Sequence, residues 1–577
     1  MCLGQLVVGA TPAAADSSVP PSLAAPTDLY DVVVYGATPA GITAAIAAAR
    51  EHLHVALLEP TDRIGGMMTS GLGTSDIGST RAIGGLALDF FKRMGAVYGL
   101  GHNQPAWNVT PGVAQRTFEA MLSDANVAVF TNEPLRQDGG VAVQDHRITS
   151  VATENGRTFA ANVFIDASYE GDLMAQAGVS FVVGREAASQ YGESLAGVRP
   201  LEPLIPRVQA TTLSGSLAPG VDAVAVGAIG SSDAWIQPYT FRLCVTQNPA
   251  DRAPFPKPTG YDPARYLLLQ RRLNSLVRVG QTPSLARVMT ITPLPQGKAD
   301  LNAAGPLSTD LLGGSNAYPN DDGAQRQALW REQYRYEAGL LYYLASDPAV
   351  PPSVQRALET WGLCRDEFTG TGNWPPQLYI REARRMVSDF VLTQKEVMSQ
   401  TPEPDAIGLA SYHIDSHPLR LVSGPGASLY SEGALLAPIP GPYEIPYRIL
   451  VPKRSEINNL LDPVTVSASH VAFASLRMEP QYMVMGEATG AAAALAVSSR
   501  VAVQDIDIRA LQASLLQHHA ILRLATRRTS STSSSSLMLL ALCTLGVVLV
   551  LALVARRRSR LGRLRMNSDQ LGRVGTR

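Results

Sequence analysis

The sequence predicts a protein of the α/β class, in which a parallel-sheet domain is split by an inserted α+β domain and followed by a transmembrane helix. Three observations predict it: a strand, turn, helix and strand pattern at 31–59, a loop-rich middle at 196–395 that differs from both flanks, and an uncharged apolar run at 537–555. The chain has 577 residues, more than one hydrophobic core usually holds, and 46% of them are hydrophobic. We therefore expect two closely joined domains.

Charge and cysteine usage exclude some classes of function. The chain has 48 basic and 49 acidic residues, so it lacks the basic excess of a nucleic-acid-binding surface, and we expect no nucleic-acid partner. Cys244 and Cys364 are the two cysteines between the chain ends, and they could pair. No CxxC motif occurs, so neither dithiol redox chemistry nor a structural zinc site is predicted.

The first structured segment indicates a nucleotide site. "YDVVVYGATPAGITAAIAAAREHLHVALLEP" combines a β-branched run, a turn from Gly36 to Gly41, an alanine-rich helix and a second strand that ends at Glu59. Such a turn can hold a pyrophosphate, because glycines let the backbone approach and the helix N-terminus presents free N–H groups. Thr38 replaces the middle glycine of GxGxxG, while Glu59 stands where a carboxylate can bind ribose hydroxyls. We predict a Rossmann-like FAD/NAD(P)-binding domain; the alternative is an ordinary tight turn.

Glycines further along favour a flavin dinucleotide. Four residues past Glu59 comes "RIGGMMTSGLG", a glycine-dense loop that a nicotinamide domain does not need. Gly486 and Gly490 lie four apart in "MGEATGAAAALA", on one helix face. They allow either close helix packing or a helix whose N-terminus points at a flavin ring. No second dinucleotide turn occurs, so an NAD(P)H domain is not predicted.

Local patterns place the predicted domain boundaries. "ITSVATENGRTFAANVFID" alternates on both sides of Asn155 and Gly156, a strong hairpin signal, and "ALWREQYRYEAGLLYYLA" is helical. The predicted segments are 1–29 (disordered or a truncated signal segment), 30–195 and 396–520 (the two parts of the nucleotide domain), 196–395 (inserted substrate domain), 521–536 (Ser/Thr-rich spacer), 537–555 (transmembrane helix) and 556–577 (Arg-rich tail).

The stretch "YHIDSHPLR", 412–420, concentrates titratable side chains. Pro418 disfavours a helix, and in an extended segment His413, Asp415 and His417 project from one side. This row could transfer protons, bind a metal or form a hydrogen-bonded polar edge. We assign no metal-binding residues.

Several strings, in order, resemble one family: "VVYGATPAGI", "IGGMMTSGLG", "FIDASYEGDLMAQAGVSFVVGRE", "LYIREARRM", "YHIDSH", "PYEIPYRILVPK" and "SASHVAFASLRMEPQYMVMGEATGAAAALA". From about 30 to 500 the chain is similar to the FAD-dependent oxidoreductase family, also labelled xanthan-lyase-related. The resemblance implies a glutathione-reductase-type FAD fold. The expected FAD contacts are Gly36, Thr38, Gly41, Glu59, Gly65, Gly66, Asp166, Gly486 and Gly490, with Arg63 from the same glycine-dense loop.

With FAD accepted, the histidine row acquires a chemical role. Oxidation by hydride transfer to a flavin needs a base for the accompanying proton, and His413 or His417 could supply it, oriented by Asp415. His470 is a second candidate. Arg420, or a helical set of Arg381, Arg384 and Arg385, could bind a carboxylate or the reduced flavin, although arginines on a helix often pair with a residue such as Glu382.

We therefore expect a membrane-anchored FAD-dependent oxidoreductase that acts on a small polar molecule and passes electrons to oxygen, a quinone or a protein. The alternative is a non-enzymatic membrane flavoprotein, either an electron carrier or an adhesion module. The arginines after the span favour a single-pass protein with an exported body; a tail-anchored protein with a cytosolic body is the competing topology.

Overall fold

The computed structural model describes residues 27–523. The signal segment expected at 1–29 therefore lies almost wholly outside the described residues, and the transmembrane helix and Arg-rich tail lie wholly outside them. Among residues 27–523, no helix is both long enough and apolar enough to cross a membrane.

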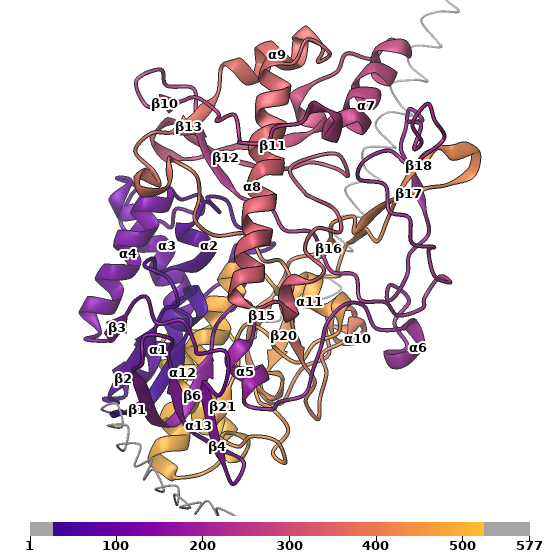
Figure 1. Cartoon of the computed structure of the whole chain (residues 1–577). Helices are drawn as coiled ribbons and strands as arrows, with labels where there is room; N and C mark the ends of the chain where they lie inside the picture. The colour runs from indigo at the N-terminus through magenta and orange to yellow at the C-terminus, as the bar shows by residue number, and fades with distance from the viewer. Residues whose placement is uncertain (1–26, 524–577) are drawn as a thin grey trace, which may run out of the picture. The chain divides into compact units, whose positions relative to one another are not determined.

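A mainly parallel sheet begins with the predicted strand, helix and strand. β1 (Thr27–Tyr35) pairs with β2 (Val55–Leu58) in parallel, and α1 (Pro39–Arg50) connects them. Residues 32–35 of β1 and all of β2 are buried, which explains the continuous apolar sequence of these segments. Figure 1 shows this sheet with α1 and α12 (Glu479–Ser499) beside it. The strand order is β3 (Ala128–Phe130), β2, β1, β6 (Thr158–Asp166), β5 (Arg147–Ala152) and β4 (Val141–Gln144), and β21 (Leu460–Leu461) also pairs with β6.

The predicted hairpin is confirmed. β5 and β6 pair antiparallel on the two sides of Asn155 and Gly156, and Gly156 has φ +87°, which favours glycine. β6 then runs parallel to β1, with Tyr35 beside Asp166. Because parallel strands end at the same sheet edge, Asp166 and the turn after β1 lie next to each other.

Two helices of small residues pack closely beside this sheet. α12 (Glu479–Ser499) runs along α1, and a Cβ added at Gly486 would lie 2.1 Å from the carbonyl oxygen of Ala40. A Cβ added at Gly490 would lie 2.1 Å from the carbonyl oxygen of Ala44. The sequence allowed either close helix packing or a helix aimed at a flavin ring for this glycine pair. The short distances to α1 show close helix packing.

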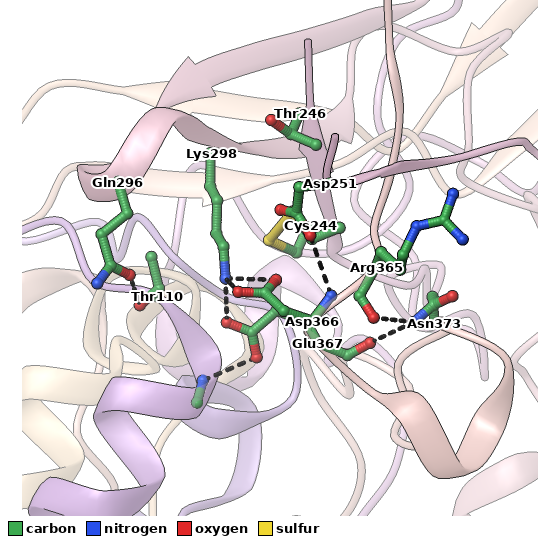
Figure 2. Close-up of a disulfide and its surroundings, with 12 residues drawn as sticks. Thr110, Cys244, Thr246, Asp251, Gln296, Lys298, Arg365, Asp366, Glu367 and Asn373 are labelled. Carbon is green, nitrogen blue, oxygen red and sulfur yellow. Dashed lines mark hydrogen bonds and ion pairs between the residues drawn. A yellow bond between two sulfur atoms is a disulfide. The ribbon is translucent and has the colours of Figure 1, made fainter. Parts of the chain in front are cut away.

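A second, antiparallel sheet lies within the predicted inserted region. Its order is β10 (Arg252–Ala253), β13 (Gly362–Cys364), β9 (Leu243–Thr246), β12 (Lys298–Ala303) and β11 (Met289–Pro293). A disulfide joins Cys244 of β9 to Cys364 of β13, with 5.6 Å between the Cα atoms. Figure 2 shows this disulfide next to the loop that carries Asp366 and Glu367, whose carboxylates both contact Lys298.

α8 (Gly323–Ser346) confirms the predicted helix of the middle region. It starts at a capping box, in which Asp322 and Gln325 satisfy each other's backbone N–H groups. The other helices of the described part are α2 (Gly66–Thr69), α3 (Gly85–Val97), α4 (Pro111–Asp124), α5 (Asp172–Gln176), α6 (Ala188–Tyr191), α7 (Leu267–Arg278), α9 (Pro352–Glu359), α10 (Gln394–Ser399), α11 (His470–Leu476) and α13 (Ile508–Gln517).

One hydrophobic core runs through both parts of the body, because Val32 of β1, Leu340 of α8 and Ala492 of α12 belong to the same cluster of buried side chains. Short strands complete the body: β7 (Phe181–Val182) with β14 (Arg385–Met386), β15 (Ala406–Ala410) with β20 (Tyr443–Pro446), β16 (Ile414–Ser416) with β19 (Leu435–Ala437), and β17 (Arg420–Ser423) with β18 (Leu429–Glu432) and β8 (Glu202–Pro203).

The prediction that Arg381, Arg384 and Arg385 lie on one helix is wrong. No helix forms there: residues 381–384 are irregular and Arg385 begins β14. The three side chains contact different carboxylates, Asp310, Asp172 and Glu186, at 3.0, 2.7 and 2.7 Å.

Candidate functional site: a dinucleotide groove and two histidine–carboxylate pairs

The turn after β1 is shaped by Thr38, the residue that departs from GxGxxG. Its hydroxyl caps α1 by accepting from the Gly41 N–H at 3.2 Å, and donates to the carbonyl of Ala167 at 2.7 Å. Gly36 has φ +93°, and a Cβ there would lie 2.7 Å from the backbone nitrogen of Ser168. The turn is thus tied to the end of β6, with α1 starting directly behind it.

Glu59 lies at the carboxyl end of β2, as predicted. One carboxylate oxygen accepts from the Ala37 N–H at 2.9 Å, and the other accepts from the N–H and hydroxyl of Thr61 at 3.0 and 2.7 Å. Burial raises the pKa of Glu59 to about 7. The carboxyl group is therefore held against the turn by backbone donors.

The glycine-dense loop is built around two left-handed residues. Gly65 has φ +93° and Gly66 φ +49°, and a Cβ at Gly66 would lie 2.5 Å from the hydroxyl of Tyr169. Arg63 donates from Nε to the Thr69 carbonyl at 2.8 Å, and its guanidinium lies 5.2 Å from the ring centroid of Phe368.

Asp166 is fully buried at the end of β6. It accepts from the N–H and hydroxyl of Ser168 and from the N–H of Met174 in α5. Burial raises the pKa of Asp166 to about 6 and, together with the Asp166 charge, raises the pKa of Asp462 to about 8. The structure thus gives Asp166 a local role: it fixes the loop between β6 and α5.

A groove runs past these elements. A cavity of about 240 Å³ is lined by Gly36, Thr38, Glu59 and Arg63, and the start of α8 forms another wall. A cavity of about 860 Å³ shares its lining residues Ser168 and Arg326. Together they give an elongated molecule room to lie across the carboxyl ends of β1, β2 and β6, where α/β sheets bind ligands. Gly41, Gly65, Gly66, Asp166, Gly486 and Gly490 do not line either cavity.

Buried polar atoms without partners occur in α11, just after it and in the first turn of α12. These are Nε2 of His470, Nε of Arg477, Oε2 of Glu479 and both amide atoms of Gln481. Buried polar groups are normally hydrogen-bonded, so such a cluster fits the polar edge of a bound ring system. The turn, the Glu59 carboxylate, the long groove and these atoms fit the requirements of FAD.

The period of two predicted for the histidine row is confirmed. β16 buries Ile414 and Ser416, while His413, Asp415 and His417 are partly exposed. The ring of His413 contacts that of Tyr412 at a tilt of 36°, with 4.0 Å between the ring centroids.

Asp310, rather than Asp415, is the carboxylate that orients His417. Nδ1 of His417 lies 2.6 Å from Oδ2 of Asp310, and Arg381 donates to the other Asp310 oxygen at 3.0 Å. Although burial by itself raises it, the Arg381 and His417 charges hold the pKa of Asp310 below its usual range. Side chains two apart on a strand stand about 7 Å apart, which is why Asp415 does not orient its neighbours.

His470 forms a second, deeper pair. Its Nδ1 lies 2.9 Å from Glu382 Oε1, and its side chain is 1% exposed, against 21% for His417. Gln237 links the two pairs, donating to Glu382 Oε2 at 3.1 Å and accepting from the His417 N–H at 3.4 Å.

Arg385 and Arg420 are held in buried ion pairs. Arg385 contacts Glu186 and Glu382 at 2.7 and 2.8 Å, and Arg420 contacts Glu432 at 3.2 Å. Their predicted role as a ligand clamp finds no support in this arrangement. Within residues 27–523 no group of three or more His, Cys, Asp or Glu side chains is arranged to hold a metal ion.

Sequence reasoning missed Asp310, Gln237 and Arg477. Asp310 and Gln237 stand in irregular segments with no period to reveal them, and they reach the site from positions more than 100 residues before His417. Arg477 could have been identified from sequence, because it lies two residues before the start of the glycine-bearing helix α12.

Comparison with known proteins agrees with this reading. The model of the protein family described as "FAD dependent oxidoreductase" matches residues 31–515. No curated protein matches the chain.

Among solved structures, similarity is weak. THI4 of Thermovibrio ammonificans has 17% identity over 27% of this chain and 66% of its own, with a TM-score of 0.21. L-amino acid deaminase of Proteus vulgaris has 16% identity over 29% and 55%, with a TM-score of 0.22. This chain thus spans less than two thirds of the length of either protein.

A geranylgeranyl bacteriochlorophyll reductase-like protein of Thermoplasma acidophilum covers more: 10% identity over 85% of this chain and 83% of its own, with a TM-score of 0.34. With the family match spanning most of the chain, the protein belongs to the FAD dependent oxidoreductase family and is a flavin enzyme with FAD as its cofactor.

Proposed function

We propose that this enzyme transfers hydride between its flavin and a small polar substrate, with His417 moving the accompanying proton. FAD, when bound, supplies the hydride acceptor. The observation that carries the proposal is the His417–Asp310 contact of 2.6 Å, made by a histidine that is still partly exposed.

Asp310 gives His417 the geometry of a general base. With its Nδ1–H donated to a buried carboxylate, the imidazole is fixed in one tautomer and Nε2 is left as the acceptor. Arg381 holds that carboxylate from the other side. His470 has the same kind of partner in Glu382, but its burial makes it the second candidate.

The residues of the groove would hold FAD. The N-terminus of α1, set by Thr38 and Gly41, would bind the pyrophosphate, and Glu59 the ribose hydroxyls. Arg63, on the groove wall, would add a positive charge beside the phosphates. Gly486 and Gly490 would act indirectly, by letting α12 approach α1.

The first experiment concerns the substrate class and the proton acceptor. We would mix the flavin-loaded protein with alcohols, amines and sugars without oxygen and follow flavin bleaching, then repeat the active pairs with variants. His417→Asn should keep its flavin and slow bleaching by about 100-fold or more. Asp310→Asn should slow it less, and His413→Asn is the comparison on the same strand. Bleaching of His417→Asn at the wild-type rate would refute the assignment.

The electron acceptor is the second question. Flavin photoreduced without oxygen is mixed with air while its visible absorption is followed. Fast recovery identifies an oxidase; slow recovery directs the search to a quinone or a protein partner.

We also propose that the body is exported and held by the apolar run at 537–555. The buried Cys244–Cys364 disulfide supports this, because disulfides persist in oxidising compartments. Trapping thiols in intact cells should recover the two cysteines in one linked peptide, and external protease should cleave the body. Free thiols and a protected body would instead indicate the tail-anchored topology.

A further inference from the structure

One buried arginine differs from all the others in the described part of the chain. Residues 27–523 bury seven arginines, and six have a carboxylate oxygen within hydrogen-bond distance. For Arg185, Arg242, Arg381, Arg384, Arg385 and Arg420 these contacts are 2.8, 3.0, 3.0, 2.7, 2.7 and 3.2 Å. For Arg477 the nearest carboxylate oxygen, Oδ2 of Asp415, is 3.8 Å away.

The hydrogen-bond partners of Arg477 are all neutral. It donates to the amide oxygen of Gln237 at 3.1 Å, the backbone carbonyl of Asp415 at 3.0 Å and the hydroxyl of Tyr379 at 3.3 Å. Its Nε has no partner, although the residue is 4% exposed. A buried cation is costly unless an anion compensates it. The guanidinium charge is therefore balanced only by the more distant Asp415 carboxylate, which makes no hydrogen bond to it.

The surroundings of Arg477 favour an anion. α12 begins two residues later, at Glu479, so the positive end of its dipole lies close by. The amide of Gln481, in the first turn of α12, is fully buried and unpaired at both its oxygen and its nitrogen. The Gln237 oxygen that accepts from Arg477 also accepts from the backbone N–H of His417, which places the guanidinium close to the His417 backbone.

We propose that Arg477, with Tyr379 and Gln237, forms a subsite for a negatively charged oxygen group next to His417. The inference deepens the proposed function and rests on it. Two sources share the chemistry: a carboxylate of the substrate, or the flavin oxygen that gains negative charge when the ring is reduced. The first would make the substrate a small carboxylic acid.

The test compares the full-length, flavin-loaded wild type with Arg477→Met and Arg477→Lys. Acetate and benzoate serve as carboxylate probes, with benzyl alcohol as the neutral control, read by flavin absorption and by Tm. If the substrate is the source, both carboxylates bind the wild type, bind Arg477→Lys more weakly and bind Arg477→Met at least 10-fold more weakly.

Sulfite distinguishes the second source, because its addition to N5 of oxidised flavin leaves a negative charge on the ring. If the flavin is the source, carboxylates do not bind the wild type, and sulfite affinity falls at least 10-fold in Arg477→Met. If Arg477→Met matches the wild type with both probes, the subsite is refuted.

A matched arginine excludes a merely structural role. Arg185→Met leaves Asp233 without its cation and leaves Glu432 with Arg420 alone, and should lower Tm. Arg477→Met removes a charge that no carboxylate hydrogen-bonds, and it should lower the Tm of the probe-free protein less than Arg185→Met does. A loss as large as that of Arg185→Met refutes the subsite. A chain that binds no flavin would refute the proposed function, while the carboxylate-dependent Tm still tests Arg477.

Discussion

At the scale of single residues, the interior of the body holds acids whose burial outweighs their hydrogen bonds. Glu337 in α8 is the clearest case. One of its oxygens accepts from Thr240, from the Phe241 N–H and from Gln333, yet burial raises its pKa to about 8. The folded protein therefore keeps a proton at neutral pH that the unfolded chain releases near pH 4.

This predicts the direction of a pH effect on stability. As pH rises from about 4.5 to 8, the free energy of unfolding falls by about 1.4 kcal/mol per pH unit on account of Glu337, because only the folded state keeps this carboxyl group protonated. Glu337→Gln keeps the oxygen acceptor and cannot ionise. Its Tm relative to wild type should rise between pH 5 and pH 8, whereas exposed Glu359→Gln should show no such trend. A pH-independent difference would contradict the assignment.

The residue scale also shows why charge clusters are hard to interpret from sequence. Arg385 and Arg420 looked available for a ligand but have buried carboxylate partners, Glu186 and Glu382 for Arg385 and Glu432 for Arg420. Arg477 looked unremarkable and lacks such a partner. The role of an arginine depends on its partners. Neighbours in sequence indicated Glu382 as a partner of Arg385, but they did not indicate Glu186, which is 199 residues away.

At the scale of elements, the contact between α1 and α12 supports the nucleotide turn. Thr38 caps the N-terminus of α1. α12 packs against α1 at Gly486 and Gly490, where the absence of a side chain lets the two helices approach closely. The same backbone that would bind the pyrophosphate is thus held from behind by the last long helix of the body.

Gly486→Ala tests this contact. Its Cβ would lie 2.1 Å from the Ala40 carbonyl oxygen, so α12 must move, at a cost of about 1–3 kcal/mol. We expect a lower Tm and weaker FAD retention, measured as flavin released on gel filtration. Gly370→Ala is the matched control, because a Cβ there meets nothing within 4 Å. Equal Tm values for the two variants would contradict the packing role.

At the scale of the whole described body, the disulfide is a long-range connection. Cys244 and Cys364 are 120 residues apart, and their bond joins neighbouring strands of the second sheet. Because it restricts the conformations of the unfolded chain, a cross-link that closes a loop of this length can raise the free energy of unfolding by about 4–5 kcal/mol. It also fixes the loop in which Asp366 and Glu367 reach Lys298 (Figure 2).

The double variant Cys244→Ala/Cys364→Ala should therefore unfold at lower urea concentration than the wild type. A reducing agent should lower the wild-type midpoint toward that of the variant and leave the variant unchanged. If reduction affects both proteins equally, the stabilisation does not come from this bond.

The sequence by itself determined the parallel start of the sheet, the hairpin at Asn155–Gly156, the long helix of the middle region, the alternation of β16 and the FAD family. These depend on local periods and short motifs, which the chain carries wherever it folds. Only the tertiary structure decided that Gly486 packs against α1, that Asp310 orients His417 and that Arg477 has no carboxylate within hydrogen-bond distance. Each of these joins segments far apart in sequence, and whether a buried polar group is satisfied depends on such neighbours.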